Sequence, residues 1–184
     1  MSEAMVGGRM GTLERRRMSW EEYLSLPEHP RTEWVDGEVV VTPDPSWRHQ
    51  RIARKLANAF DAVDGLYGST SGNVRLPNNR VRIPDAYATT EPAELFVDRP
   101  LLVVEVLSSS TRSEDLLRKG PDYAAAGIRQ FWIVDPELRT LEIHRLTAGA
   151  WAPLALFDER HTGGDVEIDG HGVVRIDLLD LLDG

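Results

Sequence analysis

The sequence predicts a mixed α/β domain in which a central β-sheet is flanked by helices. Residues 100–108 and 129–137 are apolar on both faces of a β-strand, which is typical of strands buried in the middle of a sheet. The stretch 111–127 between them begins as a helix, so it can cross over from one strand to the next. An amphipathic helix expected over 44–65 precedes the sheet.

Length and composition indicate an ordinary globular protein. The 184 residues fit one domain, expected over 18–184 after a flexible tail at 1–17. No apolar run is long enough to span a membrane, the tail lacks the apolar core of a secretory signal, and there is no cysteine for a disulfide or a thiolate metal site. We therefore expect a cytoplasmic protein that does not bind membranes. The net charge of −9 argues against indiscriminate binding to nucleic acid, which depends on neutralising phosphates.

The N-terminal part predicts a short helix, a hairpin and a longer helix. Residues 18–28 begin the short helix, and residues 32–43 form two strand-like runs around Asp36-Gly37, a pair that favours a tight hairpin turn. The helix over 44–65 has Ser46 as its expected N-cap. Its apolar stripe comprises Ile52, Leu56, Phe60 and Val63.

The rest of the chain alternates strands with one helix. Residues 73–90 give two short strands joined by a turn. The helix over 111–127 starts with Thr111 and Glu114 spaced as a capping box, and Gly120-Pro121 must kink or split it. Further strands are expected at 141–146, 152–157 and 165–168, before 174–182 closes the chain.

A carboxylate interrupts the apolar strand 100–108. Glu105 shares one face of this strand with apolar side chains, and taking a charged carboxylate out of water costs several kcal/mol unless it is paired or binds a metal. Taken alone, an arginine partner or a strand end open to water explains it. Asp85 follows Pro84, which cannot donate to a β-ladder, so the strand there is irregular or lies at an edge.

Asp85 and Glu105 are 20 residues apart on what the sequence predicts to be consecutive strands. Antiparallel pairing of these strands would bring the two carboxylates together. Like charges this close repel unless one is protonated or a cation lies between them. A hard cation such as Mg²⁺ or Mn²⁺, which prefers oxygen ligands, suits such a pair.

Lysine is rare in this chain. Of the 21 basic residues 19 are arginine, which is typical of a GC-rich bacterium, and only Lys55 and Lys119 are lysine. A lysine can therefore mark a place that needs a compact ammonium group. Lys119 follows Glu105 on the next helix, four residues after Asp115. It forms a surface ion pair with Asp115, or it reaches over the end of the Glu105 strand and stabilises charge on a phosphorane-like transition state.

Pro84-Asp85 followed by Glu105-Val106-Leu107 resembles the PD-(D/E)XK motif of restriction-endonuclease-like nucleases. Stretches such as "RTEWVDGEVVVTPDPSWRHQRIARKL" and "LLVVEVLSSSTRSEDLLRKGPDYAAAGIRQFWIVDPE" make the chain similar, over most of 18–146, to the Uma-two family of such proteins. The resemblance implies a restriction-endonuclease-like α+β core with a central mixed sheet. It also implies Mg²⁺ or Mn²⁺ held by Asp85, Glu105 and the backbone carbonyl of Val106.

The chain departs from the superfamily motif at one position. Leu107 stands where the motif has lysine, and the resemblance makes Lys119 its replacement, although Gly120-Pro121 directly after it is unusual. His49 and Glu33 are further catalytic candidates. By themselves they are a core histidine and an ordinary hairpin carboxylate, and the resemblance implies that they border the active site.

These features favour a metal-dependent endonuclease that hydrolyses DNA phosphodiester bonds, with Arg48, Arg51 and Lys55 touching flanking phosphates. The alternative is a catalytically degenerate module of the same fold that binds nucleic acid or a protein partner. A carboxylate-pair hydrolase of another bond, such as a glycosidic bond, would leave Lys119 unused. Two-fold pairing in a homodimer would suit cutting of both DNA strands.

Overall fold

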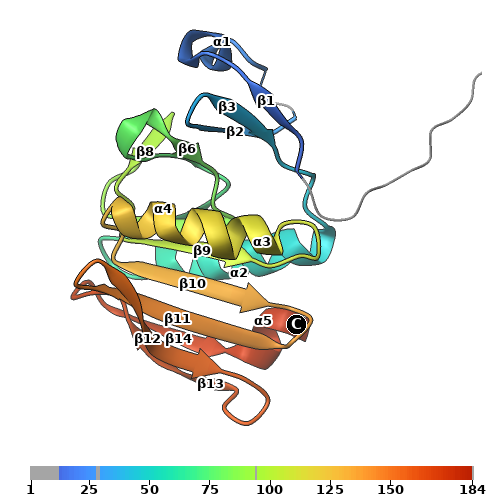
Figure 1. Ribbon diagram of the computed structural model, residues 1–184. Coiled ribbons are helices and arrows are strands. Elements are labelled where there is room, and N and C mark those ends of the chain that lie inside the picture. Colours follow the sequence, from blue (N-terminus) through green and yellow to red (C-terminus); the bar gives the residue numbers. More distant parts are fainter. Residues whose placement is uncertain (1–12, 28–29, 94, 184) are drawn as a thin grey trace, which may run out of the picture.

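The computed structural model describes residues 13–27, 30–93 and 95–183, and it has the predicted mixture of helices and strands (Figure 1). Two six-stranded sheets, here called sheet A and sheet B, and a separate hairpin contain the strands. Sheet A has the spatial order β1 (Arg15–Arg17), β3 (Glu38–Val41), β2 (Thr32–Val35), β6 (Val81–Arg82), β5 (Asn73–Arg75) and β8 (Phe96–Asp98). Sheet B has the order β12 (Ala150–Phe157), β11 (Thr140–Thr147), β10 (Gln130–Asp135), β9 (Leu102–Val106), β7 (Ala86–Thr89) and β4 (Tyr67–Thr70). The hairpin consists of β13 (Gly163–Glu167) and β14 (Val173–Asp177).

The helical segments are short except for one. They are α1 (Trp20–Leu24), α2 (Trp47–Asp61), the 3₁₀ turn η1 (Pro77–Asn79), α3 (Arg112–Glu114), the π-helical turn η2 (Asp115–Lys119), α4 (Gly120–Ala125) and α5 (Leu178–Asp183). The segments α3, η2 and α4 follow one another without a break, and we call them the crossover helix. No helix in the described part of the chain has the length and apolar character needed to cross a membrane.

The strand that carries Glu105 lies in the middle of sheet B. β9 and β10 run parallel, with Glu105 opposite Ile133, and the crossover helix connects them as predicted. β7 pairs antiparallel with β9, and β11 pairs antiparallel with β10, so the strands expected over 129–137 and 141–146 form a hairpin.

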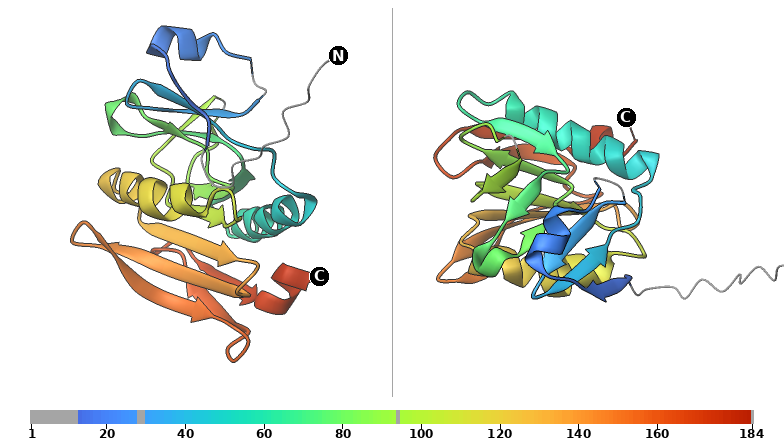
Figure 2. Two further views of the ribbon diagram at one scale, coloured as in Figure 1. Left: turned by 45° about the vertical axis from the view of Figure 1, so that its right-hand side comes forward. Right: turned by 90° about the horizontal axis from the view of Figure 1, so that it is seen from above.

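Two apolar cores lie on opposite faces of sheet B, because successive side chains of a strand point to opposite sides. The first contains the apolar stripe of α2 with Val104 and Trp132, and the hairpin β13–β14 and α5 complete it. The second contains Val103, Tyr123 and Phe131 beneath the crossover helix. Figure 1 shows this helix in front of β9, and Figure 2 shows sheet A with α1 at one end of the molecule and β13–β14 at the other.

The predicted N-terminal elements form as the local sequence requires. Asp36 and Gly37 have φ angles of 53° and 83°, as the two central residues of a type I′ hairpin turn do. The Ser46 hydroxyl accepts a hydrogen bond from the backbone N–H of His49, which fixes the first turn of α2.

The chain passes from sheet A to sheet B at Ile83–Asp85. β6 ends at Arg82 and β7 begins at Ala86, and Pro84 in between cannot donate a ladder hydrogen bond. The predicted irregularity at Pro84 is therefore a change of sheet. The expectation that Asp85 and Glu105 lie on consecutive strands is wrong in detail, because β8 comes between β7 and β9 in the sequence and pairs with β5 in sheet A.

The crossover helix does not break at Gly120-Pro121. The backbone N–H of Gly120 donates to the carbonyl of Asp115, five residues earlier, so a π-turn precedes the proline. The capping box predicted for Thr111 and Glu114 is wrong, since Thr111 makes no side-chain capping hydrogen bond. The Glu114 carboxylate instead accepts a hydrogen bond from Arg82 of sheet A.

The flexible tail predicted for 1–17 does not include its last three residues. Residues 1–12 lie outside the described part of the chain, but Arg15–Arg17 form β1 and pair with β3. Arg15 also contacts the Glu114 carboxylate, so β1 is tied to the crossover helix as well as to β3.

Candidate active site

Most of the predicted site residues line one pocket of about 210 Å³ between sheet A, α2 and the start of the crossover helix. The charged residues around it are the acids Asp44, Asp85, Glu105 and Asp115 and the bases Arg31 and Lys119. A larger hollow of about 910 Å³, near Arg75 and Arg129, contains none of the predicted residues. The smaller pocket is the candidate site because the carboxylates and the lysine meet there.

Asp85 is held at this pocket by the neighbouring strand. Its backbone N–H donates to the carbonyl of Val104, and its carboxylate accepts a hydrogen bond of 2.8 Å from the backbone N–H of Val106. This hydrogen bond ties the Asp85 side chain to the residue after Glu105, and both carboxylates line the pocket. The antiparallel pairing of β7 with β9, in which Ala86 lies opposite Val104, places Asp85 next to β9.

Glu105 has only 1% of its surface exposed, and each of its carboxylate oxygens has one donor. Oε2 lies 3.1 Å from Nζ of Lys119, and Oε1 accepts a hydrogen bond of 2.6 Å from the hydroxyl of Tyr123. Burial raises the pKa of the Glu105 carboxyl well above its usual value, and the negative charges of Asp115 and Asp85 raise it further, against the effect of Lys119.

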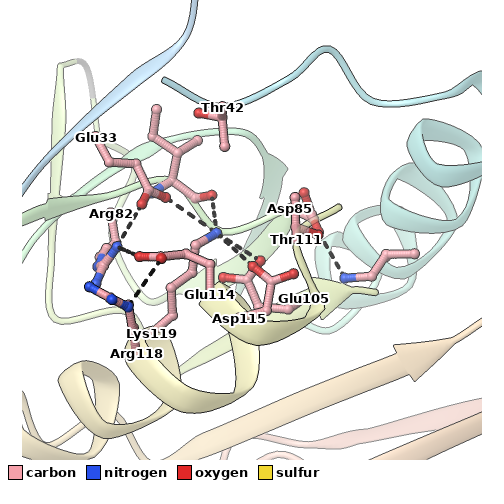
Figure 3. A network of polar contacts seen from close by, with 12 residues as sticks. Glu33, Thr42, Arg82, Asp85, Glu105, Thr111, Glu114, Asp115, Arg118 and Lys119 are labelled. Carbon is pink, nitrogen blue, oxygen red and sulfur yellow. Dashed lines mark hydrogen bonds and ion pairs between the residues drawn. The ribbon is translucent and has the colours of Figure 1, made fainter. Parts of the chain in front are cut away.

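Lys119 is the centre of the charge cluster, and Figure 3 shows its ammonium group among several carboxylates. Nζ lies 3.2 Å from Glu33, 3.1 Å from Glu105 and 3.2 Å from Asp115. The lysine is 3% exposed, so the expectation of a surface ion pair with Asp115 is wrong. Burial lowers the pKa of Lys119, but the three carboxylates outweigh this and raise the pKa well above its usual value. The group therefore stays charged.

Glu33 and His49, the two lesser candidates, also lie at the cluster. Glu33 is fully buried on β2, where it contacts Lys119 and accepts a hydrogen bond of 2.9 Å from the backbone N–H of Ile83. Burial raises the pKa of Glu33, but Lys119 and Arg82 outweigh this effect and the pKa lies below its usual value. Glu33 is therefore an ionised partner of the lysine, and only His49 of the two lines the pocket.

His49 reaches the site from the first turn of α2. Its Nε2 lies 2.9 Å from Oδ1 of Asp85, although the angle is not that of a well-directed hydrogen bond. Burial raises the pKa of Asp85, but the contact with His49 and the charge of Lys119 outweigh it and the pKa is lowered. The pKa of Asp85 is thus lowered while that of Glu105 is raised, a division typical of carboxylates that share a site.

Arg82 is a site residue that the sequence analysis missed. It is 1% exposed, and its guanidinium contacts Glu33 at 2.8 Å, Glu114 at 2.8 Å and Asp122 at 2.7 Å. It therefore joins sheet A to the crossover helix beside Lys119 (Figure 3). Asp115 and Tyr123 also contact this cluster, and their spacing of four residues on either side of Lys119 predicts that the three share one helical face.

Two of the three residues that were predicted to contact DNA phosphates contact α5 instead. Arg51 is buried and donates a hydrogen bond of 2.8 Å to the carbonyl of Leu182 in α5. Lys55 pairs with Asp180, also in α5, at 2.8 Å. Both residues fasten α5 to α2, so the proposal that they touch DNA phosphates does not fit the structure. Arg48 is exposed, does not line the pocket, and donates a long hydrogen bond of 3.4 Å to the backbone carbonyl of Pro136.

Comparison with known proteins identifies the family. The model of the Uma2 family, described as "Putative restriction endonuclease", matches residues 20–166. The chain belongs to the Uma2 family. It is 32% identical over 110 residues to the uncharacterized protein slr1290 of Synechocystis, a match that spans 54% of this chain and 58% of that protein. The crystal structure of "a putative nuclease belonging to DUF820" from Anabaena variabilis superposes with a TM-score of 0.71 and 19% identity, over 88% of this chain and 96% of that chain. This likeness confirms the predicted fold class.

In this Uma2 protein the departure at Leu107 has a structural reason. Leu107 is 5% exposed and packs in the second core with Tyr123 and Phe131. A lysine there would lose this apolar packing. The ammonium group comes instead from Lys119, which approaches Glu105 from the crossover helix.

The residues at the pocket fit a divalent cation held by few protein ligands. Within the described part of the chain no three His, Cys, Asp or Glu side chains have the spacing of a metal-binding group. Mg²⁺ commonly takes one or two carboxylates and keeps several waters. Asp85 and Glu105 provide such a pair, and four carboxylates against two cationic side chains leave an excess of negative charge at the pocket.

Proposed function

We propose that this protein is a metal-dependent endonuclease that hydrolyses phosphodiester bonds of DNA. The observation that carries the proposal is the meeting of Asp85, Glu105 and Lys119 at one pocket, from the segment before β7, from β9 and from the crossover helix. The family description and the Anabaena variabilis nuclease support it. We further propose that the protein acts in the cytoplasm and that a homodimer places two such sites on a DNA duplex.

Asp85, Glu105 and the backbone carbonyl of Val106 would hold Mg²⁺ or Mn²⁺. When bound, the cation supplies Lewis-acid chemistry that stabilises negative charge on a phosphate and makes water more acidic. Asp85 is suited to this role because the Val106 N–H fixes its orientation and its lowered pKa keeps it ionised.

Lys119 provides a fixed positive charge at the wall of the pocket. Its raised pKa keeps the ammonium protonated, and its three carboxylate partners hold it in one position. Donors fixed in place before the reaction stabilise charge that develops in a transition state without reorganising. Because its three N–H groups already face carboxylates, the ammonium would act on a phosphate in the pocket through its positive charge, while Glu33 and Asp115 keep it from turning away.

The pocket has room for a phosphate group or several waters but not for a base pair. The DNA must therefore lie across its mouth, where Arg31 lines the wall. With a net charge of −9 the chain should bind DNA weakly in general, so affinity must come from local contacts of this kind.

The test is cleavage of a panel of single- and double-stranded DNAs with Mg²⁺, with Mn²⁺ and with EDTA. We expect cleavage by the wild type that EDTA abolishes, and loss of most cleavage in Asp85→Asn. Asp98→Asn is the matched control, because Asp98 is an exposed carboxylate that pairs with Arg75 away from the pocket. A wild type that binds DNA in the panel but cleaves none of it would favour the degenerate binding module.

The proposed metal dependence has a second measurement that needs no substrate. Mg²⁺ should raise the thermal unfolding temperature of the wild type by mass action, and it should release protons because it competes with the proton on Glu105. Asp85→Ala should show neither effect at millimolar Mg²⁺. Equal shifts in the two proteins would contradict a cation site at Asp85.

A further inference from the structure

A buried hydroxyl contacts the carboxylate that is central to the proposed cation site. Tyr123 on α4 is 0% exposed, and its phenolic O–H donates a hydrogen bond of 2.6 Å to Oε1 of Glu105. Lys119 contacts the other oxygen, Oε2, at 3.1 Å. Both donors come from the crossover helix, four residues apart on one face.

The ring of Tyr123 is fixed by apolar packing. It lies in the second core, with its plane at 65° to the ring of Phe131 and the two ring centroids 5.7 Å apart. A phenol carries its proton at neutral pH, so the hydroxyl is available as the donor of this hydrogen bond. The packing of the ring and the hydrogen bond of the hydroxyl are separable contributions, because a phenylalanine could supply the first alone.

One donor on each oxygen determines how the Glu105 carboxylate can turn. A carboxylate has about four lone-pair positions, and one on each oxygen is used by Tyr123 or Lys119. The remaining positions are then fixed in direction. Without the Tyr123 hydroxyl, the group could rotate about its last bond and keep only the contact with Lys119.

We propose that Tyr123 is a positioning residue of the cation site, whose hydroxyl orients the Glu105 carboxylate so that its free lone pairs serve the divalent cation together with Asp85. This inference rests on the proposed function. Partners that orient a metal ligand typically change metal affinity or activity by about 10–100-fold when they are removed. Tyr123 touches neither the pocket nor the substrate, so it acts only through Glu105.

The test is Mn²⁺ binding to the full chain by isothermal titration calorimetry, with Tyr123→Phe compared with the wild type. We expect affinity for Mn²⁺ to fall by about 10–100-fold while the unfolding transition stays cooperative. Cleavage by Tyr123→Phe should be weak at low Mn²⁺ and should return toward the wild-type rate at high Mn²⁺, because the ligand itself is still present. A purely structural role would not give this rescue.

Tyr23→Phe is the matched control. It removes another buried tyrosine hydroxyl, which donates to the backbone carbonyl of Thr32 at 3.1 Å, and it should bind Mn²⁺ as the wild type does. If Tyr123→Phe does not fold, 4-fluorophenylalanine at position 123 fills the space of the hydroxyl without donating a hydrogen bond, and the same loss of affinity is expected.

Two negative results have different meanings. Wild-type Mn²⁺ affinity in the position 123 variants would overturn this inference and leave the proposed function standing. A wild type that binds no Mn²⁺ would overturn the cation site itself, and the positioning role with it.

Discussion

Replacement of Arg82 by methionine should destabilise the protein strongly. Arg82 is 1% exposed and contacts three carboxylates, so the change removes a buried cation without removing its partners. Two of these carboxylates have another arginine nearby, since Glu114 also contacts Arg15 and Asp122 also contacts Arg80. The cost therefore depends mainly on Glu33.

Glu33 is fully buried, and its two oxygens have different partners. Oε1 contacts Lys119 and the N–H of Ile83, while the contact of Oε2 is with Arg82. Breaking a buried ion pair by removing one partner typically costs about 3–5 kcal/mol, because a desolvated charge is left behind. For a chain of this size, this corresponds to a fall in Tm of roughly 6–20 °C, at about 2–4 °C per kcal/mol.

The measurement is urea unfolding of the wild type, Arg82→Met, Glu33→Gln and the double variant. Because the two residues contact each other, the double variant should be more stable than the sum of the single losses predicts, by about 0.5–3 kcal/mol. Arg75→Met is the control, since it removes an arginine from an exposed pair with Asp98 and should change Tm little. The reasoning would be refuted if the free energy of unfolding of Arg82→Met lay within about 1 kcal/mol of the wild-type value, or if the losses of the two single variants were additive.

Three further predictions concern the site and its support. Lys119→Arg and Lys119→Ala should each lower cleavage by about 10²–10³-fold, because the wider guanidinium does not fit where an ammonium contacts three carboxylates at 3.1–3.2 Å; full activity of Lys119→Arg would exclude the lysine from the chemistry. Glu105→Gln should raise Tm at about pH 8, because a carboxyl with a raised pKa stabilises the fold when protonated and loses this stability as pH rises through that pKa. The advantage of Glu105→Gln should shrink as the pH falls through the raised pKa, and a difference independent of pH would contradict the assignment. Phe131→Leu, beneath the crossover helix, should reduce cleavage by folded protein more than Phe157→Leu in the first core, and equal losses would show that the helix packing does not position the site.

Local sequence signals predicted most of the secondary structure. The hairpin at Asp36-Gly37, the N-cap at Ser46 and the two buried strands around the crossover helix all depend on residues close together in the chain. Tertiary contacts overrode such signals in two places. Glu114 accepts a hydrogen bond from Arg82 instead of capping the helix. Arg15–Arg17 pair with β3 instead of forming part of a flexible tail.

The candidate site was predictable only in part, because some of its residues meet through strand pairing and others only through tertiary packing. The proximity of Asp85 and Glu105 could be predicted, because β7 and β9 pair and both residues belong to the resembled motif. The role of Arg82 could not be predicted, because it is one of 19 arginines and its three partners come from β2, α3 and α4. These partners meet only when sheet A lies against the crossover helix.

The position of the lysine in the sequence determines which packing contacts set its distance from Glu105. A lysine at position 107 would share a strand with Glu105, so β9 alone would set the distance between the two groups. With Lys119 on the crossover helix, that distance depends on how the helix packs on sheet B. The same helix carries Tyr123, and Arg82 binds it from sheet A through Glu114 and Asp122. The buried network around Arg82 and the apolar packing of Phe131 therefore hold the site together from opposite sides of one helix, and a change in either should alter the geometry at Glu105 before it unfolds the protein.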